Sequence, residues 1–165
     1  MSREDENIGP LTGVRVLDLT INVLGPVATQ ILGDLGAEVI KVETPSGDPM
    51  RLIGSSKTGM LGPFFQTTNR NKKSVVLDLK KIEEKNALLK IAGGCDVFVH
   101  NMRQAATERL GIDYKNLRKA APKIIYASAT GYRRNSPKDG RPAYDDVIQG
   151  ESGLVDLIDK TNGEA

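Results

Sequence analysis

Short apolar runs recur along the chain and predict the strands of a sheet. Each run is about six residues long and rich in Val, Ile or Leu. The runs are Val14–Leu19, Ala37–Val42, Ser74–Leu79, Cys95–His100 and Lys123–Ser128. Continuous apolar runs of this length are typical of strands that are buried on both faces.

Segments with helical periodicity lie between these runs. After Pro26, apolar residues that share one helix face are Val27, Ala28, Ile31, Leu32 and Leu35, and Gly36 follows as a C-terminal cap. Further helices are predicted over Lys80–Ala92, Ala105–Leu110 and Tyr114–Ala121. The alternation of strands and helices predicts an α/β fold with a doubly wound parallel sheet.

Two long connections and a helical tail complete the pattern. The connections run from Glu43 to Lys73 and from Thr130 to Ala143, and stretches of this length are often functional. From Asp145 the apolar positions predict a helix, after which Asn162-Gly163 is typical of a turn. The final segment has no closing element, which fits either a truncated protein or a frayed terminus.

Composition narrows the classes of function. The 165 residues carry a net charge of only +2, so no global field favours nucleic acid or a membrane surface. Met1–Ile8 lacks the features of a signal peptide, and no apolar run is long enough to span a bilayer. The single cysteine fits a reducing compartment, so we expect a cytoplasmic protein. One His and one Cys provide no metal ligand set, so no metal is expected.

Ligands of open parallel sheets bind beyond the carboxyl ends of the strands. The turn Ile21–Pro26 leads into the first helix, where it is either a plain connection or a place for an anionic or carbonyl oxygen. The glycines at 25, 33 and 36 do not form G-x-G-x-x-G, which weakens the hypothesis of a nicotinamide-dependent dehydrogenase.

Three further segments leave alternatives open. The basic run Asn69–Lys73, with Lys80 and Lys81, is either a solvated face or a site for a phosphorylated ligand. His100, the only histidine, is more often structural than catalytic at a strand end. Tyr144-Asp145-Asp146 is by default the start of a helix, where acidic residues are favourable.

Several motifs in a fixed order extend this picture. They are PLTGVRVLDLT at 10–20, Gly25-Pro26, LGAEVIKVE at 35–43, Pro45, Gly47-Asp48, NRNKKS at 69–74, LDLK at 77–80, Cys95-Asp96-Val97 with Asn101, Arg109-Leu110-Gly111, IIYAS at 124–128, Gly131-Tyr132, Tyr144-Asp145, Gln149 and Ser152-Gly153. In this order the chain resembles the N-terminal portion of family III CoA-transferases, the group of formyl-CoA transferase, carnitine CoA-transferase and acyl-CoA racemase.

The resemblance implies a fold and a chemistry. The fold would be the N-terminal part of a Rossmann-like large domain, and two full-length subunits would interlock as a homodimer. The substrates would be acyl-CoA and an acceptor carboxylic acid, with coenzyme A carried on an aspartyl thioester. The expected domains are a flexible N-terminus at 1–9, an incomplete CoA-binding domain at 10–161, and the truncated start of a further segment at 162–165.

The resemblance also implies binding residues. Those expected to contact coenzyme A are Asn22, Val23, Leu24, Gly25, Leu77, Lys80, Asn101, Met102, Ala106 and Arg109. Lys80 and Arg109 would supply positive charge to phosphate groups. Tyr144 and Asp145 would have supporting roles, Asp145 at an acidic position of the family that is not the nucleophile. The racemase branch has its catalytic His at the position of Tyr144, so the resemblance there indicates a transferase and makes a racemase less likely.

The chain departs from the family pattern at some positions. Formyl-CoA transferases have a Gln at the position of Val23 and an Arg at that of Thr44, and the usual Asn-Phe pair is Asn101-Met102. Asp156 and Asp159 come too early to be the nucleophile, which the resemblance places beyond residue 165. We therefore expect an inactive fragment of a CoA-transferase. The alternative is a non-catalytic CoA-binding or assembly module.

Overall fold

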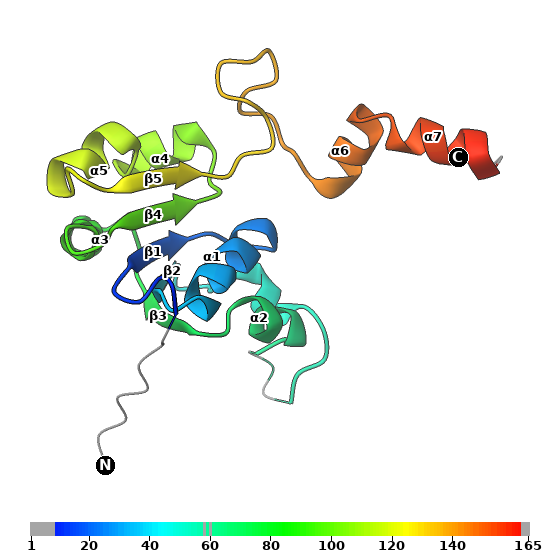
Figure 1. Ribbon diagram of the computed structural model, residues 1–165. Helices are drawn as coiled ribbons and strands as arrows, with labels where there is room; N and C mark the ends of the chain where they lie inside the picture. Colours follow the sequence, from blue (N-terminus) through cyan, green and yellow to red (C-terminus); the bar gives the residue numbers. More distant parts are fainter. Residues whose placement is uncertain (1–8, 58, 60, 163–165) are drawn as a thin grey trace. The chain divides into compact units, whose positions relative to one another are not determined.

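The structure is a computed structural model that describes residues 9–57, 59 and 61–162 (Figure 1). The expected flexible segment 1–9 and the expected final segment 162–165 therefore lie largely outside the described residues, as does Gly163 of the expected turn. The described chain separates into two compact units, one up to Ala129 and the other from Thr130. The domain boundaries drawn from the sequence stay a prediction.

The first unit contains the predicted parallel sheet. Its strands are β1 (Arg15–Leu19), β2 (Glu38–Glu43), β3 (Lys72–Val76), β4 (Val97–His100) and β5 (Ile125–Ser128). All four pairings are parallel, and the strand order is β3-β2-β1-β4-β5. Because the strands are parallel, their carboxyl ends meet at one edge of the sheet, as the arrowheads in Figure 1 show.

Helices cover both faces of this sheet. The helices of the first unit are α1 (Leu24–Asp34), a short 3-10 helix η1 (Pro49–Leu52), α2 (Pro63–Thr68), α3 (Ile82–Ala92), α4 (Gln104–Leu110) and α5 (Tyr114–Ala120). One core cluster joins Leu17 and Phe98 of the sheet to Leu88 of α3 and Leu117 of α5. On the other face, Val16 and Val39 pack with Leu32 of α1. The doubly wound α/β fold is therefore confirmed.

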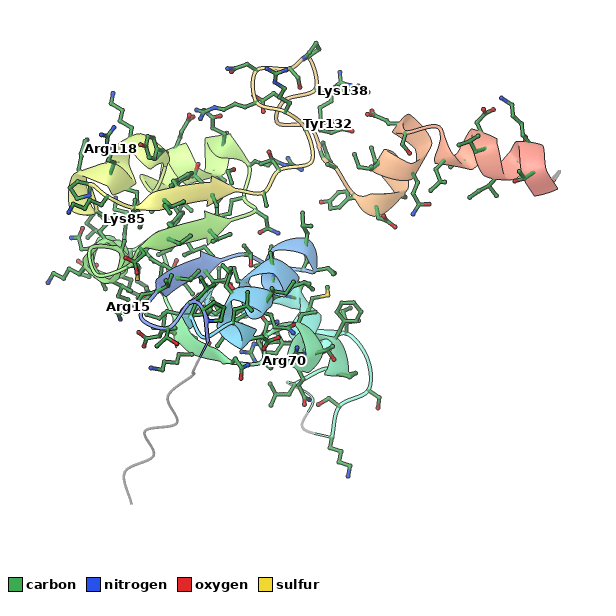
Figure 2. All side chains as sticks on the ribbon, in the orientation of Figure 1. Arg15, Arg70, Lys85, Arg118, Tyr132 and Lys138 are labelled. Carbon is green, nitrogen blue, oxygen red and sulfur yellow. The ribbon has the colours of Figure 1, made fainter. Side chains whose placement is uncertain are left out.

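Arg15 fastens the amino-terminal edge of the sheet, where Figure 2 labels it. Its Nε donates to Glu38 Oε2 at 2.7 Å, and its Nη1 donates to the Gly94 carbonyl at 2.8 Å. Its backbone N–H donates to the Asp96 carboxylate at 2.9 Å. One residue of β1 thus contacts the first residue of β2 and the segment that leads into β4.

The structure departs most from the sequence prediction at β3 and in the connection that precedes it. β3 begins at Lys72 rather than Ser74 and ends at Val76, because the Asp78 N–H turns to the Glu84 carboxylate at 2.6 Å. The connection after Glu43 is not featureless, since it contains η1 and α2. The Asp48 carboxylate caps η1 by accepting from the Met50 N–H, which is the sort of local bond that apolar periodicity does not reveal.

The second unit consists of a loop and two helices, α6 (Asp145–Glu151) and α7 (Leu154–Asn162). The sequence predicted one helical tail. Gly153 divides it, because its φ of 77° is left-handed and ends α6. The preceding loop is closed by Gly131, where an added Cβ would lie 1.9 Å from the Ala143 Cβ.

Candidate functional site

The carboxyl edge of the sheet brings together loops that are distant in sequence. β1, at the centre of the sheet, lies between β2 and β4, so the turn after Leu19 neighbours the loop after His100. The loop after β3 lies three strand spacings from β4, or about 14 Å at the usual separation of strands. The expected binding residues of the first unit thus follow three strand ends along one edge.

The turn after β1 has a backbone shape that only certain residues accept. Asn22 has a φ of 67°, in the left-handed region that asparagine tolerates better than most residues. An added Cβ at Gly25 would lie 2.3 Å from the Thr20 Cβ, so this position requires glycine. Val23 and Leu24, between them, are 44% and 70% exposed. The turn therefore presents apolar side chains from a constrained backbone.

Asn101 holds this turn from the neighbouring strand. Its Oδ1 accepts from the Ile21 N–H at 3.0 Å, and its Nδ2 donates to the Ile21 carbonyl at 2.7 Å. The Asn101 side chain therefore pairs with both the N–H and the carbonyl of Ile21, as the backbone of a neighbouring strand would. The structure brings the two expected segments, Asn22–Gly25 and Asn101, into direct contact.

The start of α1 is open on this edge. Its N-cap residue, Val23, makes no side-chain capping bond. The first helical hydrogen bond runs from the Val27 N–H to the Val23 carbonyl. The N–H groups of Leu24 and Gly25 precede that bond, and Pro26 has none. Uncapped amides at the positive end of an 11-residue helix are suited to an oxygen atom with negative charge.

Beneath the turn, on the α1 face of the sheet, lies a set of buried charges. Asp18 is fully buried, and its carboxylate accepts from the Thr20 N–H and hydroxyl, the Thr29 hydroxyl and Lys72 Nζ. The Asp18–Lys72 ion pair measures 3.0 Å. Burial lowers the pKa of Lys72, an effect that the charge of Asp18 opposes.

A second buried ion pair lies beside the first. Lys41 Nζ is 2.9 Å from Asp48 Oδ2, with both side chains at most 1% exposed. The same Nζ donates to the Thr20 carbonyl at 2.8 Å. Asp48 Oδ1 accepts from the Asn22 N–H at 3.4 Å. This pair therefore reaches two peptide groups of the turn.

Glu43 continues the network toward η1. Arg51 donates to both of its carboxylate oxygens at 2.7 Å, and Ser74 and the Asp48 N–H donate as well. Burial by itself would raise the pKa of Glu43, but these donors lower it from 4.5 to about 2. Arg51 also lies 3.8 Å above the Phe65 ring of α2.

This network of buried charges was not predicted from the sequence, although the sequence contains a signal of it. Asp18 and Lys41 are charged residues inside the apolar runs that were predicted to be buried strands. Charges in such positions need partners in the interior. The partners are distant in sequence, and the periodicity of a strand does not identify them.

The basic run at 69–73 is used within the protein. Lys72 is buried, Arg70 pairs with Asp34 at 2.6 Å, and Lys73 pairs with Glu38 at 2.7 Å. Asn69 donates to the Phe65 carbonyl, and Asn71 donates to Asp34. These five side chains thus serve the fold, which favours neither of the two interpretations that the sequence left open. Figure 2 shows Arg70 beside α2.

The expected residues after β3 differ in exposure. Leu77 is 9% exposed and belongs to the core, with its N–H bonded to the Glu43 carbonyl at 2.9 Å. Its side chain supports the loop, so only its backbone is available beside a ligand. Lys80 is exposed, and its N–H donates to Asp78 Oδ1 at 3.1 Å. The Lys80 side chain thus extends from a turn that is closed by this hydrogen bond to Asp78.

The expected residues after β4 lie on or before α4. Met102 is half-buried against the core, and Ala106 is half-buried on α4. Arg109 is exposed in the last turn of α4, where a cation also interacts favourably with the helix dipole. It is therefore positioned as a solvent-facing cation on the element that follows Asn101.

His100 is structural in its geometry. It is 1% exposed, and its ring packs edge-on against Tyr126 at 5.0 Å between centroids. Its Nδ1 accepts from the Met102 N–H, which helps to shape the loop after β4. Desolvation lowers the pKa of His100 from 6.5 to about 4, so the imidazole is neutral at pH 7. This favours the structural interpretation over catalysis.

Tyr144 and Asp145 lie in the second unit. Tyr144 is the N-cap residue of α6 without a side-chain capping bond, and it is 65% exposed. Asp145 and Asp146 occupy the first turn, and Gln149 donates to Asp145 at 2.6 Å. Their arrangement is that of a helix start with favourable acidic residues.

Residues 9–57, 59 and 61–162 contain no group of three or more His, Cys, Asp or Glu side chains arranged to hold a metal ion. None of the helices within the described ranges has the length and apolar character needed to cross a membrane.

Comparisons with known proteins identify relatives of this chain. The family model for CoA-transferase family III matches residues 11–165. Human succinyl-CoA:glutarate CoA-transferase is 42% identical over 159 residues, which cover 96% of this chain and 36% of the relative. The probable fatty acyl-CoA transferase Rv3272 of Mycobacterium tuberculosis is 45% identical over 148 residues, covering 88% and 38% of the two chains.

Solved structures agree with the sequence comparison. Rv3272 from M. tuberculosis has a TM-score of 0.82 at 44% identity, over 88% of this chain and 41% of that chain. A CAIB/BAIF family protein from Brucella suis has a TM-score of 0.84 at 35% identity, over 90% and 40% of the two chains. The chain thus spans about two fifths of the length of these proteins.

Proposed function

The chain belongs to CoA-transferase family III, and on that basis we propose that it is the CoA-binding N-terminal part of an acyl-CoA:carboxylate CoA-transferase. The observation that carries the proposal is the contact between the turn Asn22–Gly25 and Asn101 at the carboxyl edge of the sheet. These two segments follow adjacent strands and were both expected to bind coenzyme A. Ligands of open α/β sheets bind at this edge.

The spacing of the loops suits an elongated ligand. Lys80 and Arg109 are exposed cations on the loop after β3 and on the helix after β4. In the proposal these cations hold phosphate groups, while the turn after β1 lies near the thioester. Positive charge away from the reacting carbon would bind coenzyme A equally in the ground state and the transition state.

The open start of α1 supports the position of the reacting group. The N–H group of exposed Leu24 has no side-chain cap from Val23, whereas Gly25 is buried. Amides in such a position stabilise an oxygen that gains negative charge when a carboxylate attacks a thioester carbonyl. Val23 and Leu24 present apolar side chains beside that position.

The covalent step requires a nucleophilic aspartate. Asp156 and Asp159 belong to α7, in the segment that the family pattern places before the nucleophile. We propose that an aspartate in the remainder of a longer protein forms the aspartyl-CoA thioester, and that these 165 residues alone transfer no coenzyme A. The interlocked homodimer and the cytoplasmic location are part of the same proposal.

The alternative function is a CoA-binding or assembly module without catalysis. It keeps the same binding residues and differs only in the absence of a reacting carboxylate. An acyl-CoA racemase is disfavoured because Tyr144 occupies the position of the racemase His. If the longer protein exchanges CoA between two acids and does not invert an α-carbon, that activity distinguishes the transferase from both alternatives.

The test measures CoA binding by calorimetry in the longer protein. Arg109→Ala should weaken binding by about 1–3 kcal/mol, because a charge-assisted bond to phosphate is lost. Arg118→Ala is the matched control, since Arg118 is likewise exposed but lies on α5, where Figure 2 labels it. Equal affinities of the Arg109 variant and the unchanged protein would contradict the proposed binding residues.

A further inference from the structure

The turn after β1 is supported at three successive residues, Thr20, Ile21 and Asn22, through the two peptide groups that join them. The Thr20 carbonyl accepts from Lys41 Nζ at 2.8 Å. Both polar groups of the Ile21 backbone bond to the Asn101 side chain. The Asn22 N–H donates to Asp48 Oδ1 at 3.4 Å. Each support comes from a different element, namely β2, the loop after β4, and the segment that begins η1.

Two of these supports form a single buried unit. Lys41 and Asp48 are joined at 2.9 Å, and neither side chain is more than 1% exposed. A buried ion pair is a weak source of stability, because desolvation of both charges offsets much of their attraction. A pair of apolar residues would fill the same volume. The presence of the ion pair beneath a constrained turn is therefore better explained by a role in holding the shape of that turn.

We infer that the Lys41–Asp48 pair positions the turn after β1, so that Lys41 and Asp48 are positioning residues for the proposed CoA transfer. The pair contacts the Thr20 carbonyl and the Asn22 N–H on either side of Ile21, the residue whose N–H and carbonyl bond to Asn101. It thereby maintains the left-handed Asn22 and the direction in which α1 begins. The inference rests on the proposed function for its reaction, and on these contacts for its geometry.

Asp48 gains its own position from the same connection. Its N–H donates to Glu43 Oε2 at 3.1 Å, and its Oδ1 also accepts from the Met50 N–H at 3.0 Å. The long connection after β2 is therefore joined to the turn through Asp48. This gives a structural role to a segment whose function the sequence left open.

The test uses a variant without the two charges. Lys41→Met by itself would leave a buried carboxylate without its cation, and that variant could fail to fold. The double variant Lys41→Met/Asp48→Asn removes both charges and retains an acceptor for the Met50 N–H. The matched control is Glu43→Gln/Arg51→Met, because that pair is also largely buried and bonds to no atom of Thr20, Ile21 or Asn22. Its one side-chain bond to the tested pair is to the Asp48 N–H, for which the amide oxygen of Glu43→Gln remains an acceptor.

The first measurement is amide hydrogen exchange in the 165-residue chain, read at Ile21 and Asn22. In the double variant of Lys41 and Asp48, exchange at these amides should rise by about tenfold or more, because the Asn22 N–H loses a charged acceptor and the Thr20–Ile21 peptide loses the bond from Lys41 to its carbonyl. Amides in the middle of β1 should be unchanged, as should Ile21 and Asn22 in the control. A change below about twofold in the double variant would overturn the inference.

The second measurement is steady-state kinetics in the longer protein. A misplaced turn should lower kcat by about 10- to 100-fold, with the KM for the acyl-CoA nearly unchanged. An equal fall of kcat in the control would also overturn the inference, because the effect would then be general destabilisation. Absence of CoA transfer in the unchanged longer protein would contradict the proposed function, and hydrogen exchange would then decide the positioning role by itself.

Discussion

The two units of the chain use similar apolar residues in different ways. In the first unit Leu17, Leu88 and Leu117 are fully buried. In the second unit, Leu154, Leu157 and Ile158 of α7 are 43%, 61% and 45% exposed, and none of the described residues from 130 to 161 is buried. An apolar pattern therefore shows which face of a helix can be buried, and the presence of a packing partner decides whether it is.

Their polar contacts differ in the same manner. The first unit pairs Asp18 with Lys72, 54 residues apart, in the interior. The second relies on near neighbours, such as Lys160 with Asp156 at i,i+4 and Gln149 with Asp145. Long-range burial produces a cooperative fold, whereas local surface pairs contribute a few tenths of a kcal/mol each. The first unit should therefore respond far more strongly to substitution.

The largest difference in unfolding free energy between the two units should appear when an ion pair is broken in each. Lys72→Met leaves the Asp18 carboxylate buried without its cation, which should lower the free energy of unfolding by about 3–5 kcal/mol. Lys160→Met in α7 is the matched change on the surface and should stay within about 0.5 kcal/mol. Urea unfolding at pH 7 measures both. Similar losses in the two variants would contradict the division between the units.

A second contrast uses one residue type in two helices. Leu117→Ala in α5 leaves a cavity in the core and should cost about 2–5 kcal/mol. Leu157→Ala in α7 removes a side chain that is already 61% exposed, and its effect should be below about 0.5 kcal/mol. The midpoints of denaturant curves with equal slopes give both values. A large loss at Leu157 would show that α7 has a packing partner in solution.

The third prediction concerns pH and the buried imidazole of His100. Above pH 6.5 the folded and unfolded chains both hold it neutral, so stability does not depend on its titration. As the pH falls from 6.5 toward the folded pKa of about 4, only the unfolded chain binds the proton, and the free energy of unfolding falls. The loss between pH 7 and pH 5 should be about 2 kcal/mol.

His100→Asn provides the control for that slope. The asparagine keeps an acceptor for the Met102 N–H and has no proton to bind in this range. Urea unfolding at pH 7 and pH 5 should show a smaller pH dependence in the variant, by the same 2 kcal/mol or so. A slope that is identical in the two proteins would mean that His100 titrates normally in the folded state.

The sequence predicted the sheet well because its strands are short, apolar and separated by helices with clear ends. Strands β1, β2, β4 and β5 lie within the predicted runs or one residue beyond them. α2 and η1 were not predicted, since α2 has six residues and η1 four, too few for a periodic signal. The placement of β3 depended on the bond between Asp78 and Glu84, which the apolar pattern does not contain.

The candidate site was only partly predictable for a related reason. The positions of Asn22 and Asn101 after strands were visible in the sequence, and the parallel topology then made them neighbours. The buried partners of Asp18 and Lys41 could not be assigned, because Lys72 and Asp48 lie on segments whose course depends on tertiary packing. The role of Leu77 as a core residue likewise followed only from the structure.

Arg15 gives the sheet a fixed reference for alignment. It joins the start of β1 to Glu38, Gly94 and Asp96, all at the edge opposite the loops that carry the candidate site. The apolar residues of β1 alone would set its alignment weakly, because a slide by two residues keeps the same faces buried. The guanidinium and backbone N–H of Arg15, together with the buried Asp18 at the other end of the strand, remove that freedom. Loops at the carboxyl edge can consequently be exchanged by design or by evolution while the strands keep their pairing.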